Sequence, residues 1–274
     1  MITAFALVFT GICVGFLSAL LGIGGGALII PAMVVVFGYP IHTAIATSLI
    51  VIVATSSSAA SVNVLKGLVN IRLGIYLEMI TAAGAVAGGL ISTSLPEKPL
   101  MLSFSVFLLV MAFLFYKGTR AKDVMAYQVK ETSGVFRAKF YDSQKKDYIT
   151  YKAKNIPSAT LLSGFAGLIS GSMGLGGGIF KVPAMNAISK LPMKAATATS
   201  NFMIGMTASA GALIYFKSGY VQPLPSGMMV IGVILGSNIS ARTVGKIKDT
   251  TIKNIFLIFI VFVAVQMLIR SLGK

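Results

Sequence analysis

Long apolar segments alternate with short polar ones along the chain. Apolar stretches occupy residues 3–37, 43–65, 73–95, 99–116, 158–189, 195–216, 226–245 and 252–271. About 20 helical residues cross the hydrocarbon core of a bilayer, so six of these eight stretches each fit one transmembrane helix. The pattern therefore predicts a polytopic membrane protein built from helices.

The stretches 3–37 and 158–189 are too long for one crossing. As a single helix, residues 3–37 would measure about 52 Å, against a hydrocarbon core of about 30 Å. Each stretch contains a glycine cluster, GIGGG or GLGGG, and several glycines together destabilise a helix. We therefore expect each stretch to turn back as a re-entrant hairpin. The expected helix breaks are Gly22, Pro31, Gly174 and Pro183.

The glycine clusters belong to an internal repeat. Without gaps, residues 15–60 and 167–212 share 18 identities in 46 positions at an offset of 152. The three consecutive glycines, the Pro-Ala-Met after them and an Ala-Thr-Ser run all recur at this offset. This agreement indicates a duplication, with a first membrane repeat at 1–117, an insert at 118–157 and a second membrane repeat at 158–274.

The repeats predict an inverted architecture. A hairpin returns the chain to its starting side, so each repeat makes three full crossings, and an odd number of crossings turns the second repeat upside down. The expected fold is an all-α polytopic membrane protein with two inverted repeats, each a broken, re-entrant helix hairpin plus three transmembrane helices. Broken helices that meet near the membrane midplane are typical of secondary transporters with this plan.

Charge supports the hairpins and sets the orientation. The chain carries 23 Lys and Arg against seven Asp and Glu, and the basic residues lie between apolar segments. With the insert in the cytoplasm, the hairpin arrangement places eight basic residues outside the insert on the inner side and four on the outer side. Single crossings would reverse the balance to five and seven, against the positive-inside bias. Both termini are then expected outside, and the charge indicates topology rather than nucleic-acid binding.

Several function classes lack the residues that they require. The single cysteine, Cys13, excludes an intramolecular disulfide, and no cluster of His, Cys, Asp and Glu is present for a metal. Ser172 and its neighbours have no histidine or carboxylate base nearby in the sequence, and no phosphate-binding GxxxxGK[ST] motif occurs. We expect neither an enzyme nor a cofactor.

The glycine breaks predict an anion site. Helices that begin near Gly26 and Gly178 present unpaired N–H groups and a partial positive charge, and glycines let a ligand approach them. Irregular backbone at membrane depth is tolerated only where protein or a watery cavity covers it. The alternative is that the bends are structural and small residues only pack helices, as expected for Gly84-x-x-x-Gly88. The backbone expected to bind substrate comprises Gly24, Gly25, Gly26, Gly176, Gly177 and Gly178.

Polar side chains near the breaks are the other site candidates. Lys181 is an intramembrane lysine that could add a full positive charge, unless its chain snorkels to the surface. Hydroxyls and an amide could donate to an anion, or could hydrogen-bond between helices. These side chains belong to Thr47, Ser48, Thr199, Ser200 and Asn201.

Three further residues allow two interpretations each. Glu78 could take up a proton coupled to transport, or could be an interfacial carboxylate near Arg72, the alternative favoured by their separation of six residues. His42 is expected in a loop as a bystander rather than as a pH sensor. Tyr215 is expected as an interfacial anchor rather than as part of the site.

The insert carries a net charge of +5 over residues 118–156. VFRAKFYD and DYITYKAK alternate apolar and polar residues around SQKK, which is typical of a two-stranded β-hairpin. A basic face beside the inner leaflet would favour anionic lipid. The alternative is an extended linker whose charge fixes the topology.

Two G-[IL]-G-G-G breaks, each followed by a proline in an apolar chain with a central basic loop, resemble the sulfite exporter TauE/SafE family. The resemblance covers nearly the whole chain except the insert. It implies a multi-pass carrier of the cytoplasmic membrane that moves anions such as sulfite or organosulfonates outward. A passive anion channel and a non-transporting membrane scaffold are the alternatives. The anion, the coupling ion, the direction and homo-oligomerisation stay open.

Overall fold

The computed structural model describes residues 2–21, 25–116, 135–142, 147–243 and 249–272. The first half contains α1 (Ile2–Leu21), α2 (Gly26–Pro31), a π-helical turn η1 (Ala32–Val36), α3 (Ile41–Leu65), α4 (Ile71–Ser94) and α5 (Glu97–Tyr116). Strands β1 (Arg137–Asp142) and β2 (Asp147–Lys152) follow. The second half contains α6 (Ile156–Met173), α7 (Gly178–Ala187), α8 (Met193–Lys217), α9 (Pro223–Thr243) and α10 (Asp249–Leu272).

The helix boundaries repeat along the chain. Helices that begin at residues 26, 41, 71 and 97 have counterparts that begin at 178, 193, 223 and 249, each 152 positions later. The offset is the one at which the sequence repeats, so the duplicated sequence folds into duplicated elements.

The helices have the length and the surface of a membrane protein. Among the described residues, four segments are long and apolar enough to cross a membrane: Ile41–Leu65, Ile71–Ser94, Ile156–Met173 and Pro223–Ser240. Helices α5, α8 and α10, which the sequence also assigned to spans, are not among these four. Helix α8 is rich in small and hydroxyl-bearing residues that suit close helix packing. Large apolar side chains lie exposed on the outside of the bundle, among them Phe5, Leu161, Leu224 and Ile258.

The two longest helix contacts each join a helix of the first half to a helix of the second half. Helix α1 lies along α9, and its counterpart α6 lies along α4, so each contact joins one half to the other. Glycines make both contacts close: a Cβ on Gly88 would overlap the carbonyl oxygen of Leu168, and a Cβ on Gly236 would overlap that of Ile12. In each pair, residues later in one helix contact residues later in the other, as Gly84 meets Gly164 and Gly88 meets Leu168. The paired helices therefore run parallel. The expected packing role of the Gly84-x-x-x-Gly88 stripe is therefore confirmed.

The counterpart helices α3 and α8 pack against each other at the centre. Leu49 lies beside Gly211, whereas Ser56, further along α3, lies beside the earlier residue Gly205. The positions run in opposite senses, so the two helices are antiparallel. The larger apolar core forms around α3 and includes Ile45, fully buried, together with residues of α2, α5, α8, α9 and α10.

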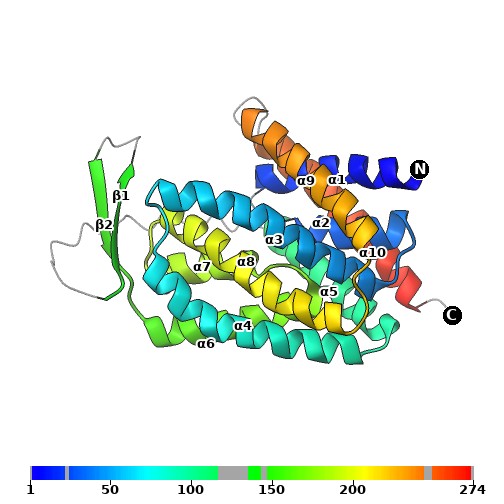
Figure 1. Cartoon of the computed structure of the whole chain (residues 1–274), viewed down its shortest axis with the longest axis horizontal. Coiled ribbons are helices and arrows are strands. Elements are labelled where there is room, and N and C mark those ends of the chain that lie inside the picture. Colours follow the sequence, from blue (N-terminus) through cyan, green and yellow to red (C-terminus); the bar gives the residue numbers. More distant parts are fainter. Residues whose placement is uncertain (1, 22–24, 117–134, 143–146, 244–248, 273–274) are drawn as a thin grey trace.

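The insert forms the expected antiparallel hairpin. Its register pairs Arg137 with Lys152 and Asp142 with Asp147. Figure 1 shows the two strands at one end of the helical bundle, with the start of α1 and the end of α10 toward the opposite side. One face of the hairpin is buried through Phe140, Ile149 and Tyr151. The alternative of an extended linker is therefore wrong for the described part of the insert.

The two residues before α6 are hydrogen-bonded to the loop after α7. The backbone N–H of Lys154, just before α6, donates to the carbonyl oxygen of Ser189, just after α7, over 3.0 Å. The side-chain amide of Asn155 donates to the carbonyl oxygen of Ile188 over 3.3 Å. Residues 154 and 189 therefore lie at the same end of the bundle, as the expected helix hairpin over 158–189 requires.

Asn70 joins this hairpin to the helices. Its carboxamide oxygen accepts from the Leu73 N–H and caps α4, and its amide nitrogen donates to the Phe136 carbonyl. Its backbone N–H donates to Thr199 Oγ1 over 3.0 Å. Burial raises the pKa of Tyr151 to about 12, although a hydrogen bond with Asn70 acts in the opposite direction. Tyr151 therefore stays neutral at physiological pH, as a buried hairpin side chain must.

Candidate functional site

The two glycine breaks meet inside the bundle. A Cβ on Gly26, at the start of α2, would overlap the carbonyl oxygen of Gly174, which ends α6. Ser48 Oγ donates to that same oxygen over 2.7 Å, from the third helix of the first half. Gly25, Gly26 and the glycines from 174 to 178 are buried. The expected convergence of the two breaks is therefore present in the described residues, whereas Gly22 and Gly24 lie outside them.

Glycine is required at the breaks for its backbone conformation. Gly25 precedes α2 with φ of +80°, and Gly177 precedes α7 with φ of +71°. Other residues rarely adopt these angles, because their Cβ would crowd the backbone. Helix α7 continues through Pro183, and at Pro31 the chain passes from α-helix into π-helix. Pro183 is therefore not a helix break, and at Pro31 the α-helix gives way to a π-helical turn, so the described breaks in the helical path lie at the glycines.

Three of the predicted hydroxyls are used in contacts between the halves. Thr47 Oγ1 lies 3.2 Å from Ser226 Oγ, Thr199 accepts from Asn70, and Ser48 donates to Gly174. These bonds match the alternative of interhelical hydrogen bonding. Asn201 is half-buried on α8.

Two buried hydroxyls beside the second break are different. Among the described residues, Ser170 Oγ and Ser200 Oγ have no hydrogen-bond partner, although both side chains are fully buried. Ser170 lies against Gly177, and Ser200 lies against Gly178. A buried polar atom without a partner costs about 1–3 kcal/mol, so such atoms mark places where a ligand could supply the missing bond. Ser170 was not predicted from the sequence, although it matches Ser18 at the repeat offset.

Lys181 forms a buried charged cluster with Glu78 and Thr207. Its Nζ donates to Glu78 Oε2 over 3.1 Å and to Thr207 Oγ1 over 2.5 Å. The Thr207 hydroxyl donates to the second carboxylate oxygen, Glu78 Oε1, over 2.5 Å. The Lys181 side chain is 1% exposed and the Glu78 side chain 5%. Helices α4, α7 and α8 each supply one member.

This cluster corrects two expectations. Glu78 is not an interfacial partner of Arg72: a separation of six residues turns the helix by about 240°, and Arg72 is exposed while Glu78 is buried. Lys181 does not snorkel to the surface, because a carboxylate is available inside. Thr207 was missed, and its only signal in the sequence was the match with Thr55 at the repeat offset.

Two aromatic positions also differ from expectation. Tyr215 is fully buried rather than interfacial, and its hydroxyl donates to Ser92 Oγ over 2.7 Å. His42 lies in the first turn of α3 rather than in a loop, with Nε2 3.1 Å from the Ser92 carbonyl oxygen. Its ring stacks on Tyr220 at a centroid distance of 4.5 Å. These residues close the end of the bundle where α4 finishes.

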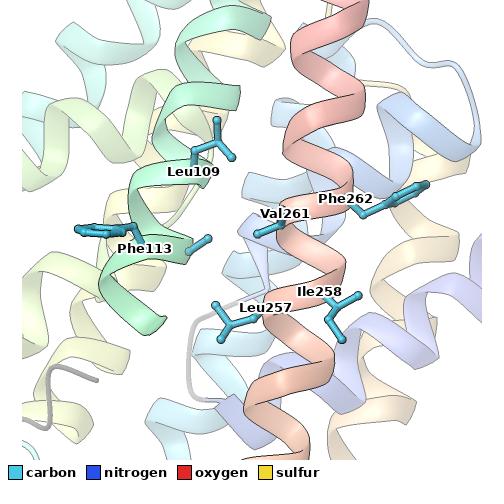
Figure 2. Close-up of a pocket in the computed structure, with 7 residues that line it drawn as sticks. Leu109, Phe113, Leu257, Ile258, Val261 and Phe262 are labelled. Carbon is cyan, nitrogen blue, oxygen red and sulfur yellow. The ribbon is translucent and has the colours of Figure 1, made fainter. Parts of the chain in front are cut away.

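No group of three or more metal-binding side chains exists among the described residues. A groove of about 600 Å³ lies between α5 and α10, and Figure 2 shows its lining of aliphatic and phenyl side chains. Leu109, Phe113, Val261 and Phe262 are among them. Because this groove has an apolar lining, it suits a lipid chain and not an anion.

A family model described as sulfite exporter TauE/SafE matches residues 7–267. The probable membrane transporter protein YunE of Bacillus subtilis is 26% identical over 274 residues, which cover 97% of each chain. The probable membrane transporter protein MJ0441 of Methanocaldococcus jannaschii is 25% identical over 88% of this chain and 86% of its own.

No solved structure gives a significant match. The relatives are named as membrane transporters, and the family model spans both repeats and the insert between them. From this coverage it follows that the chain belongs to the sulfite exporter TauE/SafE family.

Proposed function

We propose that this protein is a secondary transporter of small anions, with sulfite and organosulfonates such as sulfoacetate as its substrates. The family name supports the substrate class and the outward direction. The observation that carries the proposal is the meeting of two glycine breaks beside two buried, unpartnered hydroxyls and a buried lysine. Together these groups offer hydrogen-bond donors and positive charge in one place.

The anion site centres on the second break. Helix α7 begins at Gly178, so its first N–H groups lack partners within the helix and carry the positive end of its dipole. Ser170 Oγ and Ser200 Oγ add two donors, and Lys181 lies in the first turns of the same helix. Gly26 of the first break lies against the carbonyl oxygen of Gly174, where the second break begins. Sulfur oxyanions and sulfonates present several acceptor oxygens, which suits this set of donors.

The arrangement of the halves supports alternating access. The counterparts α3 and α8 run antiparallel, as elements related by an axis in the membrane plane would. The contact of α1 with α9 has its equivalent in the contact of α6 with α4. Two inverted repeats that rock against each other around a shared site are a recurrent transporter mechanism. The protein resides in the cell membrane, with the insert in the cytoplasm and both termini outside.

Ligand-dependent thermal stability of the purified protein tests the site. A ligand that binds only the folded state raises its stability by mass action. We expect sulfite and sulfoacetate to raise the Tm, chloride and acetate to leave it nearly unchanged, and Gly177→Leu to abolish the shift. Gly219→Leu is the matched control, because Gly219 has a similar φ of +76° but a Cβ added to it would meet open space.

Two outcomes would contradict the proposal. If neither sulfur anion stabilises the folded wild type, the central anion site is wrong. If Gly177→Leu binds sulfoacetate as the wild type does, the site lies elsewhere. In proteoliposomes, saturable uptake with counterflow distinguishes a carrier from a channel, which would give conductance without counterflow.

A further inference from the structure

The cluster of Lys181, Glu78 and Thr207 holds a positive charge in an unfavourable place. Lys181 lies in the first turns of α7, where the helix dipole already contributes partial positive charge. Its ammonium is buried, and Glu78 is its ion-pair partner. A buried ammonium without a counter-charge would cost several kcal/mol. Glu78 therefore supplies the counter-charge to Lys181 that a bound anion could supply instead.

The charge count limits what can bind beside Lys181. In the described state one cation faces one carboxylate, so the cluster is neutral. Each anionic group that a substrate brings beside Lys181 in this state would add a second negative charge against one positive charge in a low-dielectric interior. Protonation of Glu78 removes one negative charge, and one anionic group of the substrate, such as a sulfonate, then becomes the counter-charge of Lys181.

From this geometry we propose that Glu78 is the proton site of the transporter, and that a substrate anion replaces its carboxylate as the partner of Lys181. Each anion that binds is accompanied by one proton on Glu78, so the anion and the proton move together. The proton comes from the aqueous phase that the site faces and leaves to the opposite phase with the anion. This inference rests on the proposed anion site and adds its coupling ion.

Thr207 can serve both states of the cluster. Its hydroxyl now accepts from Lys181 and donates to the Glu78 carboxylate. A protonated Glu78 would donate to the same oxygen, which has lone pairs for it. Thr207 is therefore a positioning residue that keeps the carboxyl group in place while its proton comes and goes.

The helices packed around Glu78 bring no second titratable group to it. Among the described residues, α6 has none, α7 has only Lys181, and α8 has Lys194, Tyr215 and Lys217, all at least two turns from Thr207. On α4 itself, Arg72 and Tyr76 are exposed. The hairpin residues Arg137, Lys139, Asp147 and Lys152 are exposed or half-buried. Tyr151 is buried beside the start of α4 and stays neutral, because burial raises its pKa to about 12. The response to pH is thus assigned to Glu78.

The pH dependence of sulfoacetate affinity tests the coupling. The sulfonate group and the carboxylate of this probe stay ionised between about pH 8 and 5.5, so the charge of the ligand is constant. Uptake of one proton per anion predicts that wild-type affinity rises by about tenfold per pH unit as the pH falls, until Glu78 is protonated without ligand. Thermal stabilisation of the full chain at several sulfoacetate concentrations gives the affinity at each pH.

Glu78→Gln mimics the protonated residue and gives the sharpest contrast. We expect it to bind sulfoacetate at pH 8 at least tenfold more tightly than the wild type, with an affinity that no longer depends on pH. Glu97→Gln removes the same charge from an exposed position and should keep the wild-type pH dependence. Lys181→Gln should lose binding at every pH.

Proteoliposomes provide the second readout. With a pH-sensitive dye inside, a sulfoacetate gradient should carry protons inward in the wild type, whereas Glu78→Gln should exchange sulfoacetate without moving protons. The inference is overturned if the wild type binds sulfoacetate with no pH dependence, or if Glu78→Gln retains that dependence. Absence of sulfite and sulfoacetate binding in the wild type at every pH would instead count against the proposed function itself.

Discussion

Ser48 and Ser200 are equivalent residues with different surroundings. Ser48 Oγ donates to the Gly174 carbonyl oxygen, while Ser200 Oγ is buried without a partner among the described residues. Loss of a satisfied hydrogen bond destabilises a protein by about 1 kcal/mol, whereas removal of an unsatisfied buried hydroxyl relieves a cost. The pair therefore separates a structural role from a binding role at one repeated position.

Ser200→Ala should leave the Tm of the ligand-free protein unchanged or slightly raised, and should weaken sulfoacetate binding by about tenfold, the equivalent of one hydrogen bond to an anion. Ser48→Ala is the control, with a lower Tm and little change in affinity relative to the wild type. Both values come from the same thermal titration. A Ser200→Ala variant that is destabilised and still binds normally would refute the assignment.

Residue chemistry could be predicted only in part from the sequence. Lys181 stood out because a lysine inside an apolar segment is rare and functional. Its partner Glu78 could not be found, because 103 positions separate the two residues and periodicity relates only neighbours on one helix. The same limit hid the contact of Ser48 with Gly174 across the two halves.

At the scale of elements, close contact of backbones decides which helices pair. The α4–α6 contact depends on positions without a Cβ, and Gly88 faces the carbonyl oxygen of Leu168. In lipid no hydrophobic force drives two helices together, so such contacts supply much of the attraction. The sequence predicted that the Gly84-x-x-x-Gly88 stripe packs against another helix. It could not predict that this helix is α6, because small residues allow close packing without selecting a partner.

Gly88→Ala should lower the free energy of unfolding by about 1–3 kcal/mol, because the new methyl group would overlap the Leu168 carbonyl oxygen and push α4 from α6. Gly227→Ala, on α9 with open space around it, should instead stabilise by about 0.5–1 kcal/mol through helix propensity. Denaturation in detergent measures both. Equal effects of the two substitutions would contradict close packing at Gly88.

For the whole molecule, the duplication is the feature that the sequence predicted best. The offset of 152 gave the counterpart of each helix from α2 to α5, and the alternating pattern of the insert gave both strands. What the repeat could not give is how the halves interlock, with α1 along α9 and α4 along α6. Those pairings depend on three-dimensional fit, and a single sequence carries no trace of it.

The topology has a direct test in labelling of single cysteines. In a Cys13→Ser background, Ser218→Cys should react with a membrane-impermeant maleimide on intact cells, because the hairpin arrangement places the loop after α8 outside. Lys194→Cys, at the start of α8, should react only after the membrane is permeabilised. The reverse result would mean that residues 158–189 cross the membrane once, and the proposed orientation would fall.

The β-hairpin has no counterpart in the first half, since it lies between the two repeats. Identical inverted halves would make the inward-open and outward-open states mirror one another, with equal free energies and equal populations. The bonds from Lys154 and Asn155 to the loop after α7 exist at one end of the bundle only. Under the proposed alternating access, these bonds stabilise the state that is closed at that end of the bundle. Each 1.4 kcal/mol of such stabilisation shifts the ratio of the two populations about tenfold. If the protein works by the proposed alternating access, the insert makes the two states unequal in free energy and gives the empty carrier one preferred state.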